Sequence, residues 1–411
     1  MRGIGSGPDA DRDRGGFQRL SVVAPGLVPR QRRTGATGGP RPLRVAMLAP
    51  PWIPVPPPGY GGIESVVALL CDGLTTLGVE VTLFAAPGSR SRAVVRPVLP
   101  RCYPDRIERS LHEVDHVARV FDAVDDARRA GVPFDVIHDH CGFTGFAMAD
   151  RIGTPVLHTL HGPFDDDTSE FYRRHASKAA AVAISGSQAA AAPRELRVVA
   201  VIPNPTDVQG WPFSIDKQDY VLWVGRIVPE KGPHRAIAAA RAAGVRLVLA
   251  GPVQAGHESF FREAVAPHLD DERVRYVGEV GGATKQRLFM AARALLMPIR
   301  WPEPFGMVMV EAMSAGTPVI AFEEGAAPEV VEHGRTGYLV GDEDEMAAAI
   351  GRVDELDPRV CRDRAARRFG KTRVAAQYQA AYHAVIPAHH PRRGGLTTTV
   401  REKSDSRLNP A

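Results

Sequence analysis

The sequence lacks the features that mark membrane-spanning, disulfide-rich and zinc-binding proteins. It contains no uninterrupted apolar run of about 18 residues, the length that a membrane-spanning helix needs. Its four cysteines are scattered without a Cys-x-x-Cys pair, which favours reduced thiols and offers no zinc-site spacing. The first 30 residues carry no apolar segment of the secretory type. We therefore expect a cytoplasmic protein without a transmembrane segment, for which contact with the inner face of a membrane stays open.

Lysine is also scarce, because only six of the 51 basic residues are lysines. The formal charge of +4 is unevenly spread. Residues 1–44 hold nine Arg and three Asp, and residues 388–411 hold five basic and two acidic side chains, so the body between them is net negative. A basic balance that lies in the two ends is not the footprint of a nucleic-acid-binding surface, so we expect no nucleic-acid partner.

The composition is otherwise that of a globular protein, with 44% apolar and 24% charged residues. At roughly 100–200 residues per domain, 411 residues predict two or three domains. Residues 1–42 and 388–411 are rich in Gly, Pro and Arg and show no hydrophobic period. We expect them to form a disordered leader and a disordered tail outside the folded body.

Buried strands and amphipathic helices alternate along the first half of the body. The pattern predicts a strand at 43–49, a helix at 63–77 that ends at Gly78, and a second strand at 79–85. Further strands are expected at 134–139, 155–160, 181–184 and 198–202. This alternation is typical of a parallel sheet covered by helices.

The alternation stops at 209–218, where we place a linker, and then begins again. We therefore predict an α/β protein with two Rossmann-like domains, at 43–208 and 219–370. A helical pattern over 362–386 closes the chain, and its last part, 371–387, is expected to return to the first domain. In the second domain the strands are expected at 220–225, 246–251, 274–277, 294–298 and 318–322, and the helices begin near Lys231, Glu258, Thr284 and Phe305.

A glycine-rich segment, Gly59-Tyr-Gly-Gly-Ile-Glu64, lies between the first strand and its helix. Glycines at a helix N-terminus let backbone N–H groups approach an anion, although a tight turn without a ligand would use the same residues. The segment is not Gly-x-Gly-x-x-Gly, because Glu64 occupies the third position, and no acidic residue ends the second strand. Both departures argue against a nicotinamide oxidoreductase.

Histidines follow two strands of the first domain at their carboxyl ends, where open α/β sheets bind ligands. His158 and His161 are candidates for a binding role, and a structural role is the alternative. His138 and His140 have the spacing of a metal pair, but the sequence offers no third ligand. Asp165-Asp-Asp167 resembles the metal-holding motif of other transferases, yet its place in a loop favours a solvated turn.

Two motifs of the second domain combine charge with a helix N-terminus. Arg226 and Lys231 follow a strand and precede a helix, an arrangement that suits a diphosphate better than a surface ion pair. Glu303 and Glu311 flank Gly306 and are separated by about 12 Å along a helix. That separation allows one carboxylate to lie near a sugar and the other near a ribose, with helix amides facing phosphate between them.

With these residues in place, the chain resembles the retaining glycosyltransferases of family 4, which have the GT-B fold. The resemblance covers about residues 43–386. Its carriers are Pro58-Gly-Tyr-Gly-Gly-Ile-Glu64, His158-Thr-Leu-His161, Ile202-Pro-Asn204, Gly225-Arg226 with Lys231-Gly232, the pair Glu303 and Glu311, Ala315-Gly-Thr-Pro-Val319 and Gly334-Arg-Thr-Gly-Tyr338. The chain departs from the family after Asn204, where Pro205-Thr206 stands.

The resemblance implies that a nucleotide sugar binds mainly to the second domain and an acceptor to the first. Arg226 and Lys231 would hold the diphosphate, and Glu311 the ribose hydroxyls. Glu303 would contact the transferred sugar with the N–H groups of Phe305 and Gly306.

The resemblance also assigns backbone contacts and a histidine. The amides of Met307 and Val308 would meet the distal phosphate, and the Gly61-Gly62 loop would close over it. The backbone of Val280 would meet the base. His161 would lie near the reacting carbon, and His158 takes its place if the register is off by one turn.

The expected reaction is loss of a nucleoside diphosphate from an anomeric carbon, with transfer of the sugar to a hydroxyl acceptor, either a glycan, a lipid or a small molecule. We expect a UDP-sugar as the donor, retention of configuration, and no metal or other cofactor. A nucleotide-sugar epimerase or a glycan phosphorylase on the same fold is the alternative, and a non-catalytic binding module is a third reading. Glu303 and Glu311 favour the transferase, and no cofactor-lysine motif of a phosphorylase is present.

Overall fold

The computed structural model describes residues 41–59, 61–107 and 109–386. The leader and tail expected at 1–42 and 388–411 lie outside these ranges, except for residues 41 and 42. The described residues from Pro42 onward belong to one compact unit. Within the described ranges, no helix combines the length and the apolar character needed to cross a bilayer.

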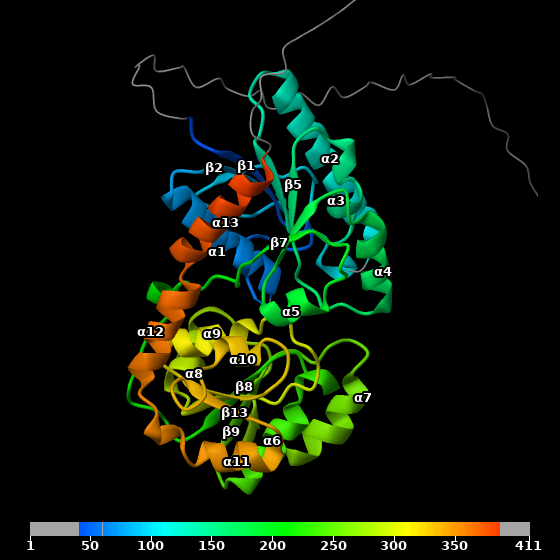
Figure 1. The fold of residues 1–411 in the computed structure, drawn as a ribbon. Coiled ribbons are helices and arrows are strands. Elements are labelled where there is room, and N and C mark those ends of the chain that lie inside the picture. Colours follow the sequence, from blue (N-terminus) through cyan, green and yellow to red (C-terminus); the bar gives the residue numbers. More distant parts are fainter. Residues whose placement is uncertain (1–40, 60, 108, 387–411) are drawn as a thin grey trace, which may run out of the picture. The chain divides into compact units, whose positions relative to one another are not determined.

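The first half of this unit is built on a seven-stranded parallel sheet in the order β3-β2-β1-β4-β5-β6-β7 (Figure 1). Its central strands are buried along almost their whole length, as expected for a sheet covered on both faces, although the polar residues His138, Asp139, His158 and Thr159 interrupt the apolar runs. The strands are β1 (Arg44–Leu48), β2 (Glu80–Phe84), β3 (Val94–Val95), β4 (Val136–Asp139), β5 (Val156–Thr159), β6 (Ala180–Ala183) and β7 (Val198–Val201).

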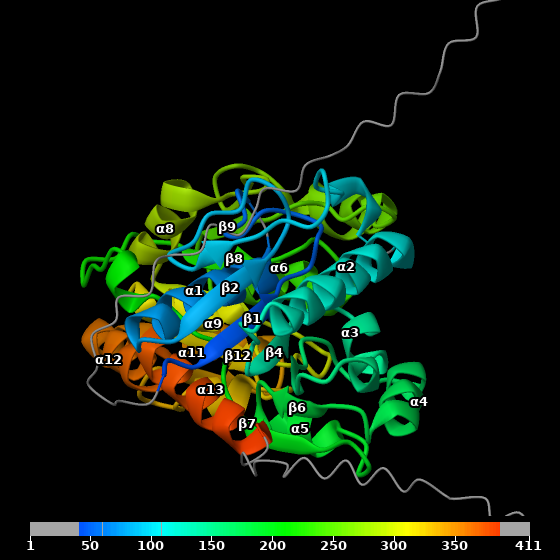
Figure 2. The ribbon, with the colours of Figure 1, turned by 90° about the horizontal axis from the view of Figure 1, so that it is seen from above.

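Helices cover both faces of this sheet. The helices α1 (Gly62–Thr76) and α13 (Lys371–Val385) pack on one face, and α2 (Ser110–Arg129), α3 (Thr144–Ala147) and α4 (Asp166–His175) pack on the other. Figure 2 shows α13 and α2 on opposite sides of the strands. The short helix α5 (Gly186–Ala191) follows β6. The carboxy-terminal helix thus belongs to the core of the first half, although it is the last element of the chain.

The second half repeats the plan with a six-stranded parallel sheet in the order β10-β9-β8-β11-β12-β13. Both sheets therefore have the doubly wound order, in which the chain reverses direction after its third strand. The strands are β8 (Val221–Val224), β9 (Leu247–Ala250), β10 (Val274–Tyr276), β11 (Ala294–Met297), β12 (Val319–Phe322) and β13 (Gly337–Val340). These two sheets and their helices confirm the predicted α/β fold.

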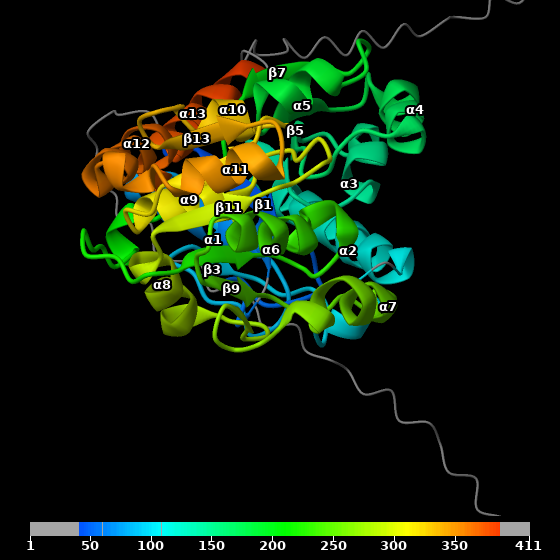
Figure 3. The ribbon, with the colours of Figure 1, turned by 90° about the horizontal axis from the view of Figure 1, so that it is seen from below.

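The helices of the second half also divide between two faces. The helices α9 (Met307–Ser314) and α12 (Pro358–Phe369) share one core with α8 (Gly282–Ala291) and α10 (Ala327–Val330). On the other face, α6 (Pro233–Ala242) and α11 (Glu343–Ile350) lie side by side, as Figure 3 shows. The short α7 (Glu258–Phe260) continues into irregular helical turns over 261–268.

The helical pattern expected over 362–386 is interrupted at Gly370, just before the helix that was expected to return to the first domain. The helix α12 ends at Phe369, and α13 begins at Lys371 after an extended Gly370. The backbone N–H of Thr206 donates to the Phe369 carbonyl at 2.7 Å, and the N–H of Lys371 donates to the Thr206 carbonyl at 3.0 Å. Thr206 thus occupies the carbonyl of Phe369 and the N–H of Lys371, which would otherwise form the hydrogen bonds that continue the helix.

Two edge strands, β3 and β13, were not predicted. The first has only two residues, too few to show a period of two, and Val94 is 69% exposed. The second begins at Gly337, inside a turn that also contains Gly334. Edge strands have a neighbour on one side only, so their sequences are less constrained than those of the buried central strands.

The strand order determines where a ligand can bind. In each sheet the crevice lies beyond the carboxyl ends of the two strands where the winding reverses, β1 and β4 in the first and β8 and β11 in the second. The segments that follow β1 and β8 contain Gly59 to Gly62 and Gly225-Arg226, respectively. His140 follows β4, and the segment after β11 leads to Glu303.

Candidate active site

A cavity of about 260 Å³ lies where these segments meet, and both halves of the chain line it. All twelve residues that the sequence singled out as catalytic or donor-binding are in its lining: Gly61, Gly62, His161, Arg226, Lys231, Val280, Glu303, Phe305, Gly306, Met307, Val308 and Glu311. The structure therefore brings the predicted residues together. Their individual roles in binding and catalysis stay predictions.

Arg226 extends from the end of β8 and is fixed by a neighbouring loop. Its Nη1 donates to the Oε1 atom of Gln254, and its Nε is buried without a partner among the described residues. The backbone beneath it is tightly packed, because a Cβ added to Gly251 would lie 1.7 Å from the Gly225 carbonyl oxygen. Gln254, which orients the guanidinium, was not predicted.

Lys231 and Glu303 form an ion pair inside the cavity. The ammonium also lies 4.8 Å from the ring centroid of Trp301, a distance at which a cation is attracted to the aromatic face. Gly232 allows this placement, because its φ of 69° is left-handed and a Cβ there would lie 2.3 Å from the Pro298 carbonyl oxygen. The two predicted side chains therefore act on one another in the ligand-free protein.

A second loop holds the backbone of Glu303. The carbonyl of Glu303 accepts from the N–H of Ala326 at 3.0 Å. Gly325 has a φ of 54°, and a Cβ there would lie 2.5 Å from both N and O of Glu303. The carboxylate is therefore carried by a loop that is fixed from behind.

The helix α9 begins inside the cavity, immediately after Gly306. That glycine has a φ of 80°, and no side chain caps the helix. The first N–H groups of a helix have no partner within it, so the amides of Met307 and Val308 are available to an anion. The helix dipole adds to the attraction for negative charge at this end.

Glu311 is held by Lys285, a residue that the sequence analysis missed. The Lys285 ammonium donates to Oε1 of Glu311 at 2.7 Å, and both side chains line the cavity. The other carboxylate oxygen, Oε2, is buried and has no hydrogen-bond partner among the described residues. A buried acceptor of this kind suits a ligand hydroxyl. Lys285 is one of only six lysines, but no motif set it apart.

The first half contributes the glycine loop and α1. The hydroxyl of Ser65 donates to the Gly61 carbonyl at 2.7 Å, which fixes the start of the helix. A Cβ added to Gly61 would lie 2.7 Å from Cβ of Pro57, whereas one added to Gly62 would meet nothing within 4 Å. Packing therefore explains why position 61 is a glycine, but it does not explain the glycine at position 62.

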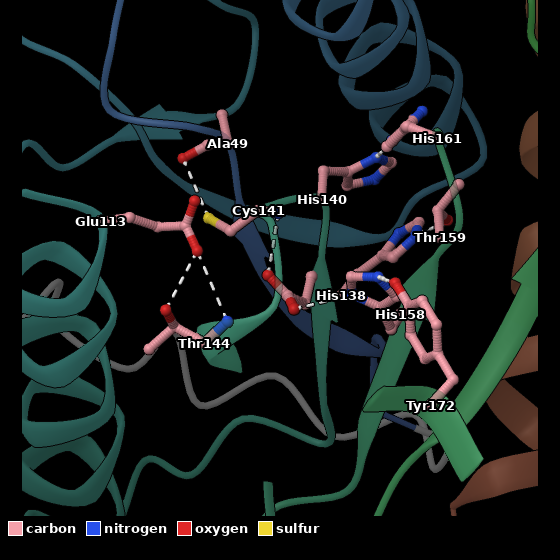
Figure 4. A network of polar contacts seen from close by, with 11 residues as sticks. Ala49, Glu113, His138, His140, Cys141, Thr144, His158, Thr159, His161 and Tyr172 are labelled. Carbon is pink, nitrogen blue, oxygen red and sulfur yellow. Dashed lines mark hydrogen bonds and ion pairs between the residues drawn. The ribbon is translucent and has the colours of Figure 1, made fainter. Parts of the chain in front are cut away.

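A cluster of histidines lies in the first half, next to the part of the cavity lining that this half supplies (Figure 4). Nδ1 of His140 is 2.9 Å from Nε2 of His161, and His138 hydrogen-bonds with Tyr382 and Thr159. These contacts give the pair His138 and His140 a structural explanation. No group of three or more metal-ligating side chains occurs within the described ranges.

The cluster also distinguishes the two candidates His158 and His161. His158 is buried away from the cavity, where it hydrogen-bonds with Asp139 at 2.8 Å and Tyr172 at 3.1 Å. His161 lines the cavity. Asp165, in the acidic loop that follows, accepts from the N–H of Thr168 and caps α4.

Burial keeps several of these imidazoles neutral. It lowers the pKa of His161 to about 3, with a smaller effect of His158 in the same direction and an opposing effect of Asp139. Burial also lowers the pKa values of His138 and His140 well below the ordinary value of 6.5, and the neighbouring imidazoles add to this. The pKa of His116, which is bonded to the Ala49 carbonyl, falls to about 4 for the same main reason.

Comparisons with known proteins agree with this architecture. Residues 60–209 match the family model "Glycosyltransferase Family 4", and residues 210–368 match "Glycosyl transferases group 1". Together the two matches span every strand of the two sheets except β1, and all of the predicted site residues. The chain belongs to the family 4 glycosyltransferases with the GT-B fold.

Its similarity to individual proteins is moderate but extends over nearly their whole length. It is 26% identical to the D-inositol 3-phosphate glycosyltransferase of Pseudarthrobacter chlorophenolicus, over 84% of this chain and 96% of that protein. The crystal structure of AviGT4, a glycosyltransferase involved in avilamycin A biosynthesis, superposes with a TM-score of 0.61 at 28% identity, covering 84% and 98% of the two chains. Sucrose-phosphate synthase from Thermosynechococcus elongatus has a TM-score of 0.68 at 22% identity, covering 83% and 98%, a likeness of fold.

Proposed function

We propose that this glycosyltransferase moves a sugar from a nucleoside diphosphate donor, above all UDP, to a hydroxyl group with retention of configuration and without a metal ion. One observation carries the proposal: a single cavity contains Arg226, Lys231, the start of α9 and a carboxylate whose buried Oε2 has no partner among the described residues. These are the groups that a diphosphate, flanked by a ribose and a sugar, requires.

The cations and the helix end would act on the leaving group. As the bond between the anomeric carbon and the phosphate oxygen breaks, negative charge grows on the diphosphate. Arg226 and the first amides of α9 are positioned in advance, so they would stabilise the transition state without reorganisation, and Lys231 would join them once the donor is bound. In this proposal Lys231 turns from Glu303 toward the diphosphate, and Glu303 is released to accept a hydrogen bond from the sugar.

Retention follows from the side on which the acceptor attacks. We propose that the acceptor oxygen forms its bond to the anomeric carbon on the face that the diphosphate leaves, and that the departing phosphate takes the acceptor proton. Among the lining residues of the first half, none is a carboxylate that could act as a covalent nucleophile. The wall consists of glycines, apolar side chains, Ser65, Asn204 and His161.

A ligand screen tests the donor. The melting temperature of the protein would be measured with UDP, GDP and ADP and with their sugar derivatives. A nucleotide at 100 times its dissociation constant adds about 2.7 kcal/mol of stability, and UDP should give the largest shift. If none of the nucleotides raises the melting temperature, the proposal is wrong.

A product assay separates transfer from the alternative reaction on this fold. The donor that binds would be incubated with a panel of polyols, including myo-inositol with and without a phosphate, because several relatives are named for inositol 3-phosphate. Mass spectrometry should detect a glycosylated acceptor together with free nucleoside diphosphate. An epimerase would instead return an epimeric nucleotide sugar of unchanged mass, with neither a glycosylated acceptor nor a matching amount of free nucleoside diphosphate.

A further inference from the structure

His140 is fully buried and forms a hydrogen bond with His161, the histidine that reaches the cavity (Figure 4). The two ring nitrogens are Nδ1 of His140 and Nε2 of His161, 2.9 Å apart. His161 lines the cavity, and its Nδ1 makes no hydrogen bond with the described residues. This nitrogen is therefore available to bind a ligand in the cavity. A histidine behind the site can therefore control what His161 presents to that ligand.

Only one proton can lie in the bond between two neutral imidazoles, so one ring donates and the other accepts. If His161 donated, its Nδ1 would be a bare acceptor, and the proton of His140 would be on its own Nε2. That Nε2 is buried without a partner among the described residues. Buried N–H groups without a partner are rarer than unpartnered acceptors, so His140 is the better donor.

We propose that His140 is a positioning residue for the transfer reaction: its Nδ1–H donates to Nε2 of His161 and thereby fixes the tautomer of His161 that carries its proton on Nδ1. His161 then presents an uncharged N–H donor to the sugar. This inference rests on the proposed function.

The surroundings of the pair support a neutral donor. Burial holds the pKa values of both rings below the ordinary value. The titratable groups that face the pair are the imidazoles of His138 and His158 and the buried carboxylate of Asp139, which is itself bonded to His158. A neutral ring suits a reaction in which positive charge develops on the sugar, because an imidazolium would repel that charge.

The experiment compares three replacements of His140. In His140→Asn the amide nitrogen falls near the position of Nδ1 and can still donate to His161. His140→Asp has the same shape but offers only acceptors, so His161 must turn its proton toward it. His140→Leu removes the bond. Nitrogen-15 NMR of the histidine side chains in the full-length, ligand-free protein reports the tautomer directly.

We expect Nδ1–H on His161 in the wild type and in His140→Asn, and Nε2–H in His140→Asp. Transfer should be retained in His140→Asn and fall about tenfold in His140→Leu, roughly the effect of one hydrogen bond. In His140→Asp kcat should also acquire an acid limb, because the carboxylate raises the pKa of His161. UDP affinity should be unchanged in all three, since the charged groups proposed to bind it lie in the other half and the substitutions leave the Gly61-Gly62 loop intact.

Two results would overturn the inference: the same His161 tautomer in all four proteins, or equal kcat and the same pH profile for His140→Asn and His140→Asp. If His140→Asp does not fold, the inference is tested by comparing the His161 tautomer in His140→Asn with that in His140→Leu. Failure of the proposed function looks different, because the wild type would then bind no nucleotide while NMR would still report the tautomers.

Discussion

The two walls of the cavity differ in how they treat charge. The second half supplies six charged side chains, and two ion pairs join Lys231 with Glu303 and Lys285 with Glu311. The six are Arg226, Lys231, Glu279, Lys285, Glu303 and Glu311. The first half supplies glycines, Asn204 and a histidine whose pKa is low. The charged wall suits a diphosphate, and the neutral wall suits a sugar on which positive charge develops. Two sheets with the same doubly wound order therefore carry cavity walls of different charge, because the segments that follow their strands differ.

The sharpest test of the charged wall is removal of Arg226. Arg226→Ala should lower turnover by roughly 10²–10³, the scale of losing one preorganised group that stabilises transition-state charge. Arg287→Ala is the matched control, because that exposed side chain donates to Thr284 on its own helix and is not part of the cavity lining. Steady-state kinetics decides, and an equal loss in the two variants would mean that a cation at this position is not special.

Acidification tests the neutral wall. A histidine whose pKa is lowered in the folded state binds fewer protons than it does in the unfolded chain. The free energy of unfolding is therefore highest above about pH 7 and falls as the pH drops below the unfolded pKa of 6.5. At pH 5 each histidine with a pKa near 3 should lower the free energy of unfolding by about 2 kcal/mol. Melting temperatures between pH 8 and 5 measure this effect.

The matched variants for this test are His140→Asn and His383→Gln. The first removes a fully buried imidazole and should make the pH dependence shallower, whereas the second alters an exposed side chain and should leave it unchanged. A slope that is the same in all three proteins would show that the buried histidines do not set the acid response.

Within the charged wall, replacing each of the two glutamates should change a different kinetic constant. Glu311→Gln should raise the donor KM about tenfold with less change in kcat, because ribose contacts are equal in the ground and transition states. Lys285→Met should behave in the same way, since Lys285 holds the Glu311 carboxylate. Glu303→Gln should instead lower kcat. A loss of kcat in Glu311→Gln with normal constants in Glu303→Gln would reverse the assignment.

The two glycines of the first half offer a smaller contrast. Gly62→Ala should leave the melting temperature unchanged, because its Cβ would meet nothing within 4 Å, yet it should weaken donor binding several-fold. Gly61→Ala should lower the melting temperature, because the added Cβ would lie 2.8 Å from Cδ1 of Ile53. Unchanged donor affinity in Gly62→Ala would place the diphosphate away from this loop.

The smallest effect is expected from chelation. Two cations and a helix end are proposed to do the work of a metal, so transfer measured before and after treatment with EDTA should be the same. Activity that disappears and returns with Mg²⁺ or Mn²⁺ would show that the charged wall needs an ion to complete it.

The sequence was sufficient for the strands other than β3 and β13 and for twelve of the residues that line the cavity. Buried parallel strands are continuous apolar runs, and the side chains that follow them gather at one edge, so local patterns such as Gly225-Arg226 carry positional information. Glu311 was identifiable because a glutamate is unusual in an apolar helix, and Glu303 because it stands just before the N-terminus of that helix.

The partners of these residues could not be predicted. Lys285 meets Glu311 across two helices, and Gln254 reaches Arg226 from the loop after β9. Each is an ordinary polar residue in its own segment, and only tertiary packing gives it a neighbour. The break at Gly370 has the same origin, because Thr206, about 160 residues earlier, supplies the competing backbone hydrogen bonds.

The position of α13 has a consequence for how the protein is made. Val374, Ala375, Tyr378, Ala381 and Tyr382 complete the core of the first half, and Tyr382 hydrogen-bonds with His138. At about 5–20 residues per second, a ribosome reaches this helix on the order of ten seconds or more after it has completed β7. Until then only α1 covers this face of the sheet in the nascent first half, so it should stay open to proteases in chains stalled before Lys371 and become protected once residue 385 has left the ribosome.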